Sequence, residues 1–251
     1  MNISGNTVLI TGGATGIGYA MAESFLIAGN EVIICGRRKE KLIEAQSRHP
    51  KFHIKVCDVA KENDRLELLE WTNTELRDLN ILVNNAGIQR DIDFTQGISD
   101  YLSGENEIKI NLESPILLSG LFIPYLTGKK GAAIINITSG LGFIPAARTP
   151  VYSATKAGMH AFSMALRHQL LKTGIKVYEI VPPAVESELN REGRAKRGNF
   201  KIDLKPDEFV ASVMQDLQKD IFEIGYGMTS GLNKASREDL DNSFQQMNSR
   251  W

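Results

Sequence analysis

The segment TGGATGIG, residues 11–18, decides the fold of this 251-residue chain. It follows the apolar run NTVLIT (6–11), which is typical of a buried β-strand. It leads into IGYAMAESFLIAG (17–29), which has helical periodicity and ends at Gly29. Glycines at 12, 16 and 18 permit the sharp turn that joins a strand directly to a helix. The stretch therefore predicts the start of a β-α-β unit.

The spacing G-x-x-x-G-x-G also favours one kind of ligand. The backbone N–H groups of such a turn can approach a pyrophosphate, and the N-terminus of the next helix adds a favourable dipole. A glycine triplet alone is unspecific, but between the first strand and first helix of a β-α-β unit it indicates a dinucleotide site. The cofactor contacts expected in this turn are Gly12, Thr15, Gly16, Ile17 and Gly18.

The same alternation continues along the chain. Further strands are predicted at 31–36, 52–59, 80–87, 132–140, 175–183 and near 222–227. Helices are predicted at 39–47, 62–76, about 105–126, 152–172 and 206–219. The strands are nearly continuous apolar runs, which is typical of a parallel sheet covered on both faces. We expect an α/β, Rossmann-type doubly wound, mainly parallel seven-stranded sheet in a single domain over 1–251.

Composition narrows the class of protein. The chain is 42% hydrophobic and its net charge is −1, which argues against nucleic-acid binding through bulk electrostatics. There is no signal-peptide pattern and no apolar run near the ~18 residues of a membrane span, so we expect a soluble, cytoplasmic protein. Cys35 and Cys57 are expected to be buried free thiols. The histidines have no metal-ligand spacing, and no metal is predicted.

The end of the second strand indicates which dinucleotide binds. A carboxylate there would bond the adenosine ribose and favour NAD, but this strand ends in Gly36-Arg37-Arg38. A guanidinium group suits a phosphate, so Arg37 and Arg38 predict NADP(H), with NAD(H) as a possible second cofactor. The alternative is that both arginines are only a solvated first turn of the next helix.

Two more strand ends are expected to face the cofactor. After the third strand, Asp58 and Val59 are placed to meet the adenine, although Asp58 can also be a simple helix N-cap. After the fourth strand comes NNAG, 84–87, in which Asn84 is expected to tie strands together. Asn85, Ala86 and Gly87 are expected along the cofactor, and an Asx turn is the alternative.

The catalytic candidates are Ser139, at the end of the fifth strand, and the pair Tyr152 and Lys156 in VYSATKAGM, 151–159. Alone, such a pair can be two ordinary exposed side chains on a helix. Together, however, TGGATGIG, NNAG, the helical Asn111, Ser139 and YSATK, in this order, resemble the short-chain dehydrogenase/reductase family over nearly the whole chain. The resemblance implies that Asn111, Ser139, Tyr152 and Lys156 form a catalytic tetrad, with Tyr152 and Lys156 also touching the cofactor.

The proton chemistry of this tetrad is consistent with the resemblance. Hydride transfer to a carbonyl creates an oxyanion that needs a proton, and Tyr152 can supply it. A free phenol has a pKa near ~10, so we expect the Lys156 ammonium and the positive nicotinamide to favour the phenolate. Ser139 would bond the substrate oxygen, and Asn111 would anchor a water that links Lys156 to solvent. The predicted activity is that of a carbonyl reductase or alcohol dehydrogenase.

A closer resemblance is carried by GNEVIICGRR, VNNAGIQ, ALRHQL, VPPAVESELN and EDLDNSFQQMN. These stretches are similar to a short-chain oxidoreductase encoded with bacterial teichoic-acid D-alanylation genes, and that genomic company implies no substrate. One departure from the wider family is Pro182-Pro183 in place of Pro-Gly. The second proline removes a backbone donor. Contact of Pro182 and Val185 with the nicotinamide is still expected.

The C-terminal third is less patterned. The polar segment 184–205 follows the sixth strand and is a candidate substrate lid. Its Arg191, Arg194, Lys196 and Arg197 could meet an acidic substrate, but a solvated face is favoured. Phe143 and Ile144 are expected in a partly apolar substrate pocket, and His160 is expected to be a packing residue. Leu240, Phe244 and Met247, at helical spacing, predict docking on the core, with a subunit interface as the alternative.

Two other functions fit parts of the pattern. A non-catalytic dinucleotide-binding regulator or scaffold would keep the glycine turn, but it would not need a proton relay. A sugar-nucleotide epimerase or dehydratase also uses a Tyr-x-x-x-Lys pair, but it usually carries a larger C-terminal domain than this chain allows. The family resemblance further implies a homodimer or homotetramer built on the helices at 105–126 and 152–172.

Overall fold

The computed structural model describes residues 1–196, 198 and 202–249. Among them, seven parallel strands form one sheet in the order β3-β2-β1-β4-β5-β6-β7. The strands are β1 (Thr7–Thr11), β2 (Glu31–Gly36), β3 (His53–Val56), β4 (Leu79–Asn84), β5 (Ala133–Ile137), β6 (Lys176–Val181) and β7 (Glu223–Gly225). The strand order reverses between β1 and β4. In open α/β sheets, ligands bind at the carboxyl ends of the strands beside such a reversal.

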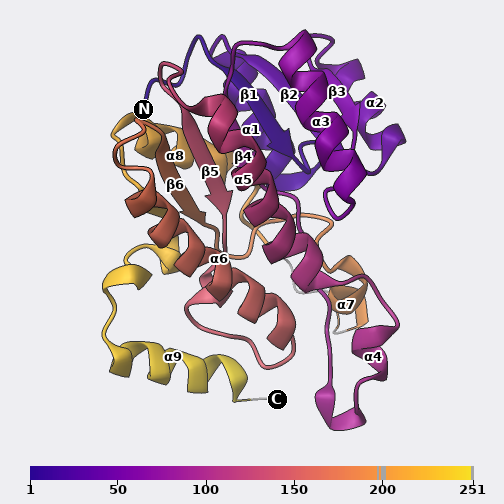
Figure 1. The fold of residues 1–251 in the computed structure, drawn as a ribbon. Coiled ribbons are helices and arrows are strands. Elements are labelled where there is room, and N and C mark those ends of the chain that lie inside the picture. Colours follow the sequence, from indigo (N-terminus) through magenta and orange to yellow (C-terminus); the bar gives the residue numbers. More distant parts are fainter. Residues whose placement is uncertain (197, 199–201, 250–251) are drawn as a thin grey trace.

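Helices cover both faces of this sheet (Figure 1). One face is covered by α1, α2 and α8, and the other by α3, α5 and α6. The helices are α1 (Gly16–Ile27), α2 (Lys39–Arg48), α3 (Glu62–Glu75), α4 (Ser99–Leu102), α5 (Ser114–Leu126), α6 (Pro150–Gln169), α7 (Arg191–Lys196), α8 (Pro206–Gln218) and α9 (Arg237–Asn248). The predicted doubly wound α/β fold is confirmed.

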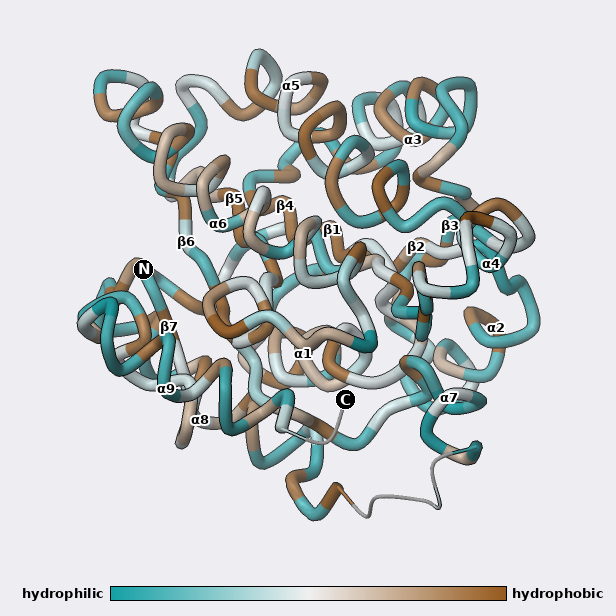
Figure 2. Tube along the Cα trace, turned by 90° about the horizontal axis from the view of Figure 1, so that it is seen from below, coloured by the Kyte–Doolittle hydropathy of each residue, from teal (hydrophilic) through white to brown (hydrophobic). Residues whose placement is uncertain are grey.

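Alternate residues of each strand enter two separate cores, which explains why the strands are apolar throughout. In β1, Val8 and Ile10 belong to the core beneath α1, whereas Leu9 belongs to the core beneath α5 and α6. All three are fully buried. Cys35 and Cys57 are buried free thiols, as predicted. Figure 2, seen from the side of the strands' carboxyl ends, shows hydrophobic segments at the centre and hydrophilic turns outside.

The long helix predicted over 105–126 is present but irregular. A π-helical turn, Lys109–Glu113, precedes α5, and Ser114 donates its N–H to the carbonyl of Lys109. Pro115 has no N–H, so the carbonyl of Asn111 lacks the donor that a regular helix places four residues on. Such π-turns are frequent at functional sites, and this one contains a predicted catalytic residue. The short helix α4 was not predicted.

The predicted docking of the C-terminal stripe on the core is wrong. α9 lies apart from the sheet (Figure 1), and all of its residues, including Leu240, Phe244 and Met247, are at least partly exposed. Near its end, Asn248 accepts a bond from the Ala147 N–H at 2.7 Å and donates to the Pro145 carbonyl at 3.0 Å. Helical spacing identifies an apolar face but does not identify what covers it.

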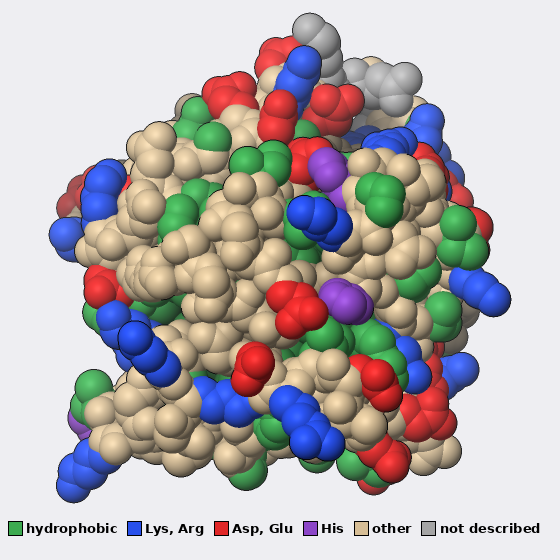
Figure 3. All heavy atoms as spheres, turned by 90° about the horizontal axis from the view of Figure 1, so that it is seen from above, with side chains coloured by type: hydrophobic (Ala, Val, Ile, Leu, Met, Phe, Trp, Pro, Cys, Tyr) green, Lys and Arg blue, Asp and Glu red, His purple; other side chains and the backbone are tan. Residues whose placement is uncertain are grey.

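The outer surface is mixed in charge. On the face at the amino ends of the strands, Lys and Arg side chains are interspersed with Asp and Glu (Figure 3). Within the described ranges, no helix is both long enough and apolar enough to cross a membrane. Of the basic run predicted in the 184–205 segment, Arg191, Arg194 and Lys196 lie on α7, whereas Arg197 lies outside the described residues.

Candidate active site

A cleft of about 2140 Å³ lies at the carboxyl edge of the sheet, where the strand order reverses. Its walls come from the carboxyl ends of all seven strands of the sheet and the turns that follow them, from the segment 184–196 and from α9. Every residue that the sequence indicates for cofactor contact borders this cleft. Ser139, Tyr152 and Lys156 border it too, whereas Asn111 is buried behind its wall.

Three glycines of the turn, Gly12, Gly13 and Gly18, leave no room for a Cβ. Gly12 and Gly16 have φ angles of +63° and +56°, which side chains disfavour. A Cβ on Gly18 would lie 2.4 Å from the Gly12 carbonyl oxygen and from Asn85 Nδ2. α1 begins here, and its first residues line the cleft. An anion in this turn would meet backbone N–H groups and the positive end of a helix dipole, as a pyrophosphate requires.

The NNAG loop is locked against the glycine turn. Thr11 Oγ1 accepts from the N–H groups of Asn85 and Ala86, each at 3.0 Å, and Asn85 Nδ2 donates back to the Thr11 carbonyl. Asn84 Nδ2 donates to Asn136 Oδ1 at 2.9 Å, so the predicted tie between strands is confirmed. The two loops therefore form one continuous wall.

Asp58 lies at the far end of the cleft, after β3. Its Oδ1 accepts from the Ala60 N–H at 3.1 Å, and its own N–H donates to Asp64 Oδ2 at 2.7 Å. The N-cap position of α3 is occupied by Lys61. The alternative that Asp58 is the helix N-cap is therefore wrong. Its carboxylate instead forms an Asx turn that ends just before the N-cap residue.

Arg37 and Arg38 border the cleft at the end of β2, and each is paired with a carboxylate. Arg37 pairs with Glu105, and Arg38 pairs with Glu188 at 2.7 Å. Arg38 also donates to the Thr15 hydroxyl at 3.4 Å. The four charged side chains are about half exposed, so each pair contributes at most about 1 kcal/mol. A phosphate could displace either carboxylate at small cost.

Ser139, Tyr152 and Lys156 meet where β5 ends against the first turns of α6. Lys156 Nζ lies 5.6 Å from the centre of the Tyr152 ring and donates to the Ile137 carbonyl at 2.8 Å. Ser139 is hydrogen-bonded to Tyr152, and its Oγ accepts from the Leu141 N–H at 3.1 Å. Tyr152 and Lys156 are both buried in the cleft wall.

Burial sets the proton affinities of these groups. It raises the pKa of Tyr152 to about 12, against the opposing effect of the bond from Ser139. Burial also lowers the pKa of Lys156 to about 8. The predicted lowering of the phenol's pKa by Lys156 is not seen in the chain alone, since burial dominates and the lysine bonds Ile137. At neutral pH the chain by itself holds Tyr152 as a phenol, the form that donates a proton.

Asn111 uses its side chain for structure. Its Oδ1 accepts from the Ile88 N–H, and its Nδ2 donates to the Ile88 carbonyl, both at 2.8 Å. Nδ2 also lies 3.3 Å from Thr155 Oγ1 on α6. The side chain thus joins the loop after β4 to the catalytic helix. The group of Asn111 that suits a water is its main-chain carbonyl, which Pro115 leaves without the usual donor.

A second polar group joins α6 to the ends of β5 and β6, and its Glu179 was not indicated by the sequence. His160 Nδ1 lies 2.9 Å from Glu179 Oε2, and Thr138 Oγ1 donates to Glu179 Oε1 at 2.7 Å. His160 is therefore a satisfied packing residue, as predicted. The ring of Phe143 packs against His160, tilted by 53° with the ring centroids 4.4 Å apart. The expectation that Phe143 lines the pocket is therefore wrong, whereas Ile144 does line it. Glu223 lies within 4.8 Å of this pair, but both Glu179 oxygens are already hydrogen-bonded.

Glu105, Glu107 and Glu188 are further site residues that sequence reasoning missed. Glu105 and Glu188 pair with arginines far away in the chain, which no local pattern reveals. Glu107 is fully buried, although ENEIK, 105–109, looks like the polar start of a surface helix. The only available signal was its position one helical turn before Asn111.

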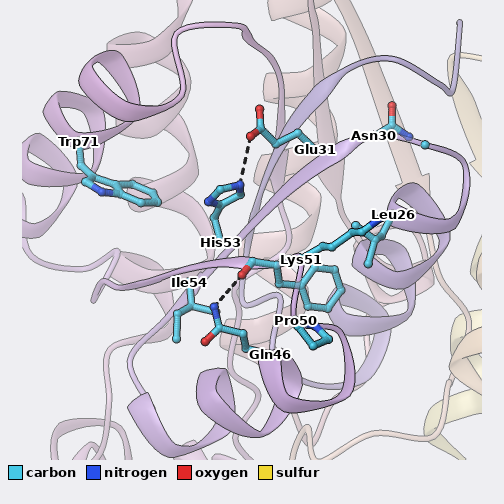
Figure 4. A pocket seen from close by; sticks show the side chains of 11 residues that line it. Leu26, Asn30, Glu31, Gln46, Pro50, Lys51, His53, Ile54 and Trp71 are labelled. Carbon is cyan, nitrogen blue, oxygen red and sulfur yellow. Dashed lines mark hydrogen bonds and ion pairs between the residues drawn. The ribbon is translucent and has the colours of Figure 1, made fainter.

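A separate hollow of about 810 Å³ lies at the opposite edge of the sheet, beside the starts of β2 and β3. Its lining includes Trp71 and the pair Glu31 and His53, whose Oε1 and Nε2 are 3.1 Å apart (Figure 4). Gln46 Nε2 donates to the Phe52 carbonyl in its wall. It contains none of the predicted catalytic or cofactor residues, so the first cleft is the candidate active site.

Comparison with known proteins gives the class. Residues 6–198 match the family model described as short chain dehydrogenase. The oxidoreductase DltE of Bacillus subtilis is 45% identical over 250 residues, covering 100% of this chain and 99% of the relative. The NAD(+)-dependent 15-hydroxyprostaglandin dehydrogenase of Mus musculus is 30% identical, covering 82% and 78%. A serine dehydrogenase in closed form with NADP+ superposes with a TM-score of 0.78 at 27% identity, covering 88% and 94%.

The chain therefore belongs to the short-chain dehydrogenase/reductase family of oxidoreductases. The closer resemblance seen in the sequence, to the short-chain oxidoreductase of the D-alanylation locus, is confirmed by the similarity to DltE. A short-chain dehydrogenase from Sphingobium yanoikuyae in complex with NADPH has the same fold, with a TM-score of 0.80 at 24% identity.

Proposed function

We propose that this protein is an NADP(H)-dependent oxidoreductase that interconverts a carbonyl compound and an alcohol, with Tyr152 as general acid and base. One observation supports this most strongly. A buried phenol, a buried lysine and a strand-end serine meet in the same cleft as a glycine turn built for a pyrophosphate. A dinucleotide-binding regulator would need the turn but not the trio.

The residues of the cleft fit the cofactor. The tight glycine turn and the N-terminus of α1 would hold the pyrophosphate. Arg37 and Arg38 would hold the 2′-phosphate after leaving Glu105 and Glu188. The backbone around Val185 and Pro182, which lines the opposite wall, would receive the nicotinamide end. The NADP+ and NADPH complexes of similar proteins support this choice of cofactor.

Each catalytic side chain has one task. When bound, NADPH supplies the hydride. Tyr152 donates the proton that the carbonyl oxygen needs, and Ser139 donates a hydrogen bond to the same oxygen. Lys156 lies beside the Tyr152 ring and donates to the Ile137 carbonyl, and from there its ammonium can return a proton to the phenolate that Tyr152 becomes. The Asn111 carbonyl holds the water that connects Lys156 to solvent. In the direction of oxidation the same proton moves back.

The rim of the cleft defines the substrate pocket. The segment 184–205 acts as the lid of this single domain, and its ends are joined by the bond from the Glu186 N–H to the Leu204 carbonyl at 2.9 Å. From the lid, Asn190 Nδ2 donates to Oδ1 of Asp91, in the loop after β4, at 2.8 Å. Apolar residues from five places line the substrate end, which favours a partly apolar carbonyl compound: Leu141, Ile144, Leu189, Met228, Leu232 and Met247.

The test is NADPH consumption by the purified protein across a panel of aldehydes, ketones and quinones. Turnover of at least one compound class with NADPH, at a rate about tenfold or more above that with NADH, is expected. Equal use of NADH would overturn the cofactor assignment. Tight NADPH binding with no turnover of any carbonyl, in either direction, would favour a regulator.

A further inference from the structure

Glu179 places a carboxylate inside the core of the sheet. It lies on β6 between Tyr178 and Ile180, and all three residues are 0% exposed. Its Oε1 accepts from Thr138 Oγ1 at 2.7 Å, and its Oε2 lies 2.9 Å from His160 Nδ1. A buried carboxylate costs folding free energy unless such bonds replace its lost hydration. An apolar residue would fill the position without that cost, so stability alone does not explain the carboxylate.

The two partners of this carboxylate each stand next to a catalytic candidate. Thr138 directly precedes Ser139 at the end of β5. His160 lies one helical turn after Lys156 and about two turns after Tyr152, on the same face of α6. Two short hydrogen bonds to one side chain therefore link the strand that carries the serine to the helix that carries the phenol and the lysine.

The link is directional, unlike the apolar packing around it. Apolar burial holds α6 against the sheet but has no preferred direction, whereas hydrogen bonds to a carboxylate fix distance and orientation. A second polar tie runs from Lys156 Nζ to the Ile137 carbonyl at 2.8 Å, but this lysine passes protons in the proposed mechanism. Glu179 does not border the cleft, so it can stay fixed while Lys156 acts.

We propose that Glu179 is a positioning residue, whose carboxylate sets the spacing between Ser139 on β5 and Tyr152 on α6. The proposal rests on the function assigned above to Tyr152. Proton transfer requires its groups within hydrogen-bond reach of one substrate oxygen, and a shift of about 1 Å can slow such a reaction about 100-fold. Loss of the carboxylate should therefore slow turnover although every group that takes part in the chemistry is still present.

The surroundings of Glu179 allow the link to be removed without unfolding the protein. Without the carboxylate, Thr138 Oγ1 can donate to the Ile180 carbonyl, which already lies 3.1 Å away. The His160 side chain is 22% exposed, so water can reach it. No buried charge is then left unpaired, and an unpaired charge is what makes the loss of one partner costly. A fall in turnover can thus be separated from a loss of fold.

The test is Glu179→Leu, which keeps a side chain of similar size but has no acceptor. With the best substrate of the carbonyl panel, single-turnover NADPH oxidation should slow about tenfold or more, whereas KM and the Kd for NADPH should stay within about twofold. Thr138→Val removes the link from the other side, so it should give a similar loss, and the double variant should be no slower than either single variant. Glu179→Gln keeps an oxygen for Thr138 and should restore the rate to within about threefold of the unchanged protein.

Glu223→Gln is the matched control. Glu223 is the register partner of Glu179 on β7, but its carboxylate bonds neither Thr138 nor His160, so the variant should leave the rate unchanged. It also tests a metal site, because His160, Glu179 and Glu223 have ligand atoms within 4.8 Å of one another. If these residues held a metal ion, Glu223→Gln and a chelator would each slow the reaction as Glu179→Leu does, and the positioning role would be overturned.

Crystal structures of the unchanged protein and of Glu179→Leu give a second readout, which needs no substrate. The distance between Ser139 Oγ and the Tyr152 hydroxyl oxygen should differ by about 0.5 Å or more. An equal distance, or an unchanged rate in the folded variant, would overturn the proposal. If Glu179→Leu does not fold, Thr138→Val takes its place in both measurements. If the unchanged protein reduces no carbonyl, the assigned function fails, and the two structures still decide whether Glu179 sets this spacing.

Discussion

The floor and the rim of the cleft are built in opposite ways. The floor consists of strand ends and α6, where Tyr152 and Lys156 are buried and nearly every polar group is bonded. The rim consists of the segment 184–196 and α9, and every described residue of α9 is at least partly exposed. Asn248 holds α9 in place through its hydrogen bonds to the Ala147 N–H and the Pro145 carbonyl.

Under the proposed function, this difference assigns chemistry to the floor and selectivity to the rim. Proton transfer depends on distances within the buried floor, which tolerate little change. Substrate choice depends on side chains that border the open end, where loops vary at small cost to stability. If the separation is real, changes in the floor should abolish turnover or cofactor binding, and changes in the rim should alter only the substrate affinity.

The largest expected effect is in the floor, at Lys156. Lys156→Met should reduce turnover about 10²–10⁴-fold, because the proton route to Tyr152 is lost. The same variant should unfold less easily at pH 7, by about 1–2 kcal/mol. Burial lowers the pKa of Lys156 to about 8, so its charge costs stability at neutral pH, partly offset by the bond to Ile137.

That gain in stability has a defined pH dependence. The folded chain binds Lys156's proton less tightly than the unfolded chain, so the cost is present at neutral pH and disappears as pH rises through about 8 toward the ordinary lysine value. Urea unfolding of both proteins between about pH 7 and pH 10 measures it. A constant difference across this range would contradict a buried ammonium.

A second change tests the glycine turn. Gly18→Ala places a Cβ 2.4 Å from the Gly12 carbonyl and from Asn85, so the turn must shift. NADPH affinity should fall about 100-fold, and stability by about 1–3 kcal/mol. Gly120→Ala is the matched control, because nothing lies within 4 Å of its Cβ, and it should stabilise α5 by about 1 kcal/mol. Fluorescence titration with NADPH measures the affinity, and unchanged binding by Gly18→Ala would show that the pyrophosphate lies elsewhere.

A third change concerns the cofactor's 2′-phosphate. Arg37→Ala should raise the Kd for NADPH about tenfold and leave the Kd for NADH nearly unchanged. Glu105→Gln, which removes the competing carboxylate, should tighten NADPH binding about two- to threefold. Titration of both variants with both cofactors checks this. An equal loss for NADPH and NADH would show that Arg37 serves only the structure of the loop.

The smallest effect is expected at the rim. Met247→Ser on α9 should change the free energy of unfolding by less than about 0.5 kcal/mol, because the side chain is partly exposed. It should change KM about two- to threefold and leave kcat unchanged, since α9 borders only the open end of the cleft. A loss of stability above about 2 kcal/mol would mean that α9 has a buried partner in solution and that the floor–rim separation fails.

Sequence alone predicted the floor well, for physical reasons. In TGGATGIG a Cβ at Gly12, Gly13 or Gly18 would collide with neighbouring atoms, and Tyr152 and Lys156 are placed on one face by one helical turn. The continuous apolar strands likewise allow only a sheet covered on both faces. Each of these constraints acts between residues close together in the chain, so it produces a pattern that can be recognised in the sequence.

The remainder depends on contacts between distant residues. Arg38 meets Glu188 across 150 positions, and nothing near either residue in the sequence announces the pair. Glu107 was missed because the acidic start of a helix is usually solvated, and only the packing of α6 buries it. The spacing of the apolar residues in α9 correctly indicated a helix with one apolar face, but it did not indicate where that helix packs. The position of Phe143 was likewise decided by His160, an aromatic neighbour on another element.

The most direct test of the account is a comparison of Tyr152→Phe with the unchanged protein, using the best substrate of the carbonyl panel. Single-turnover NADPH oxidation and NADPH binding are measured on the same samples. The account predicts binding within about twofold and hydride transfer slower by about 10³-fold, because the phenylalanine keeps the ring but has no proton to give. Equal rates in the two proteins would contradict it, since the proton would then come from another group.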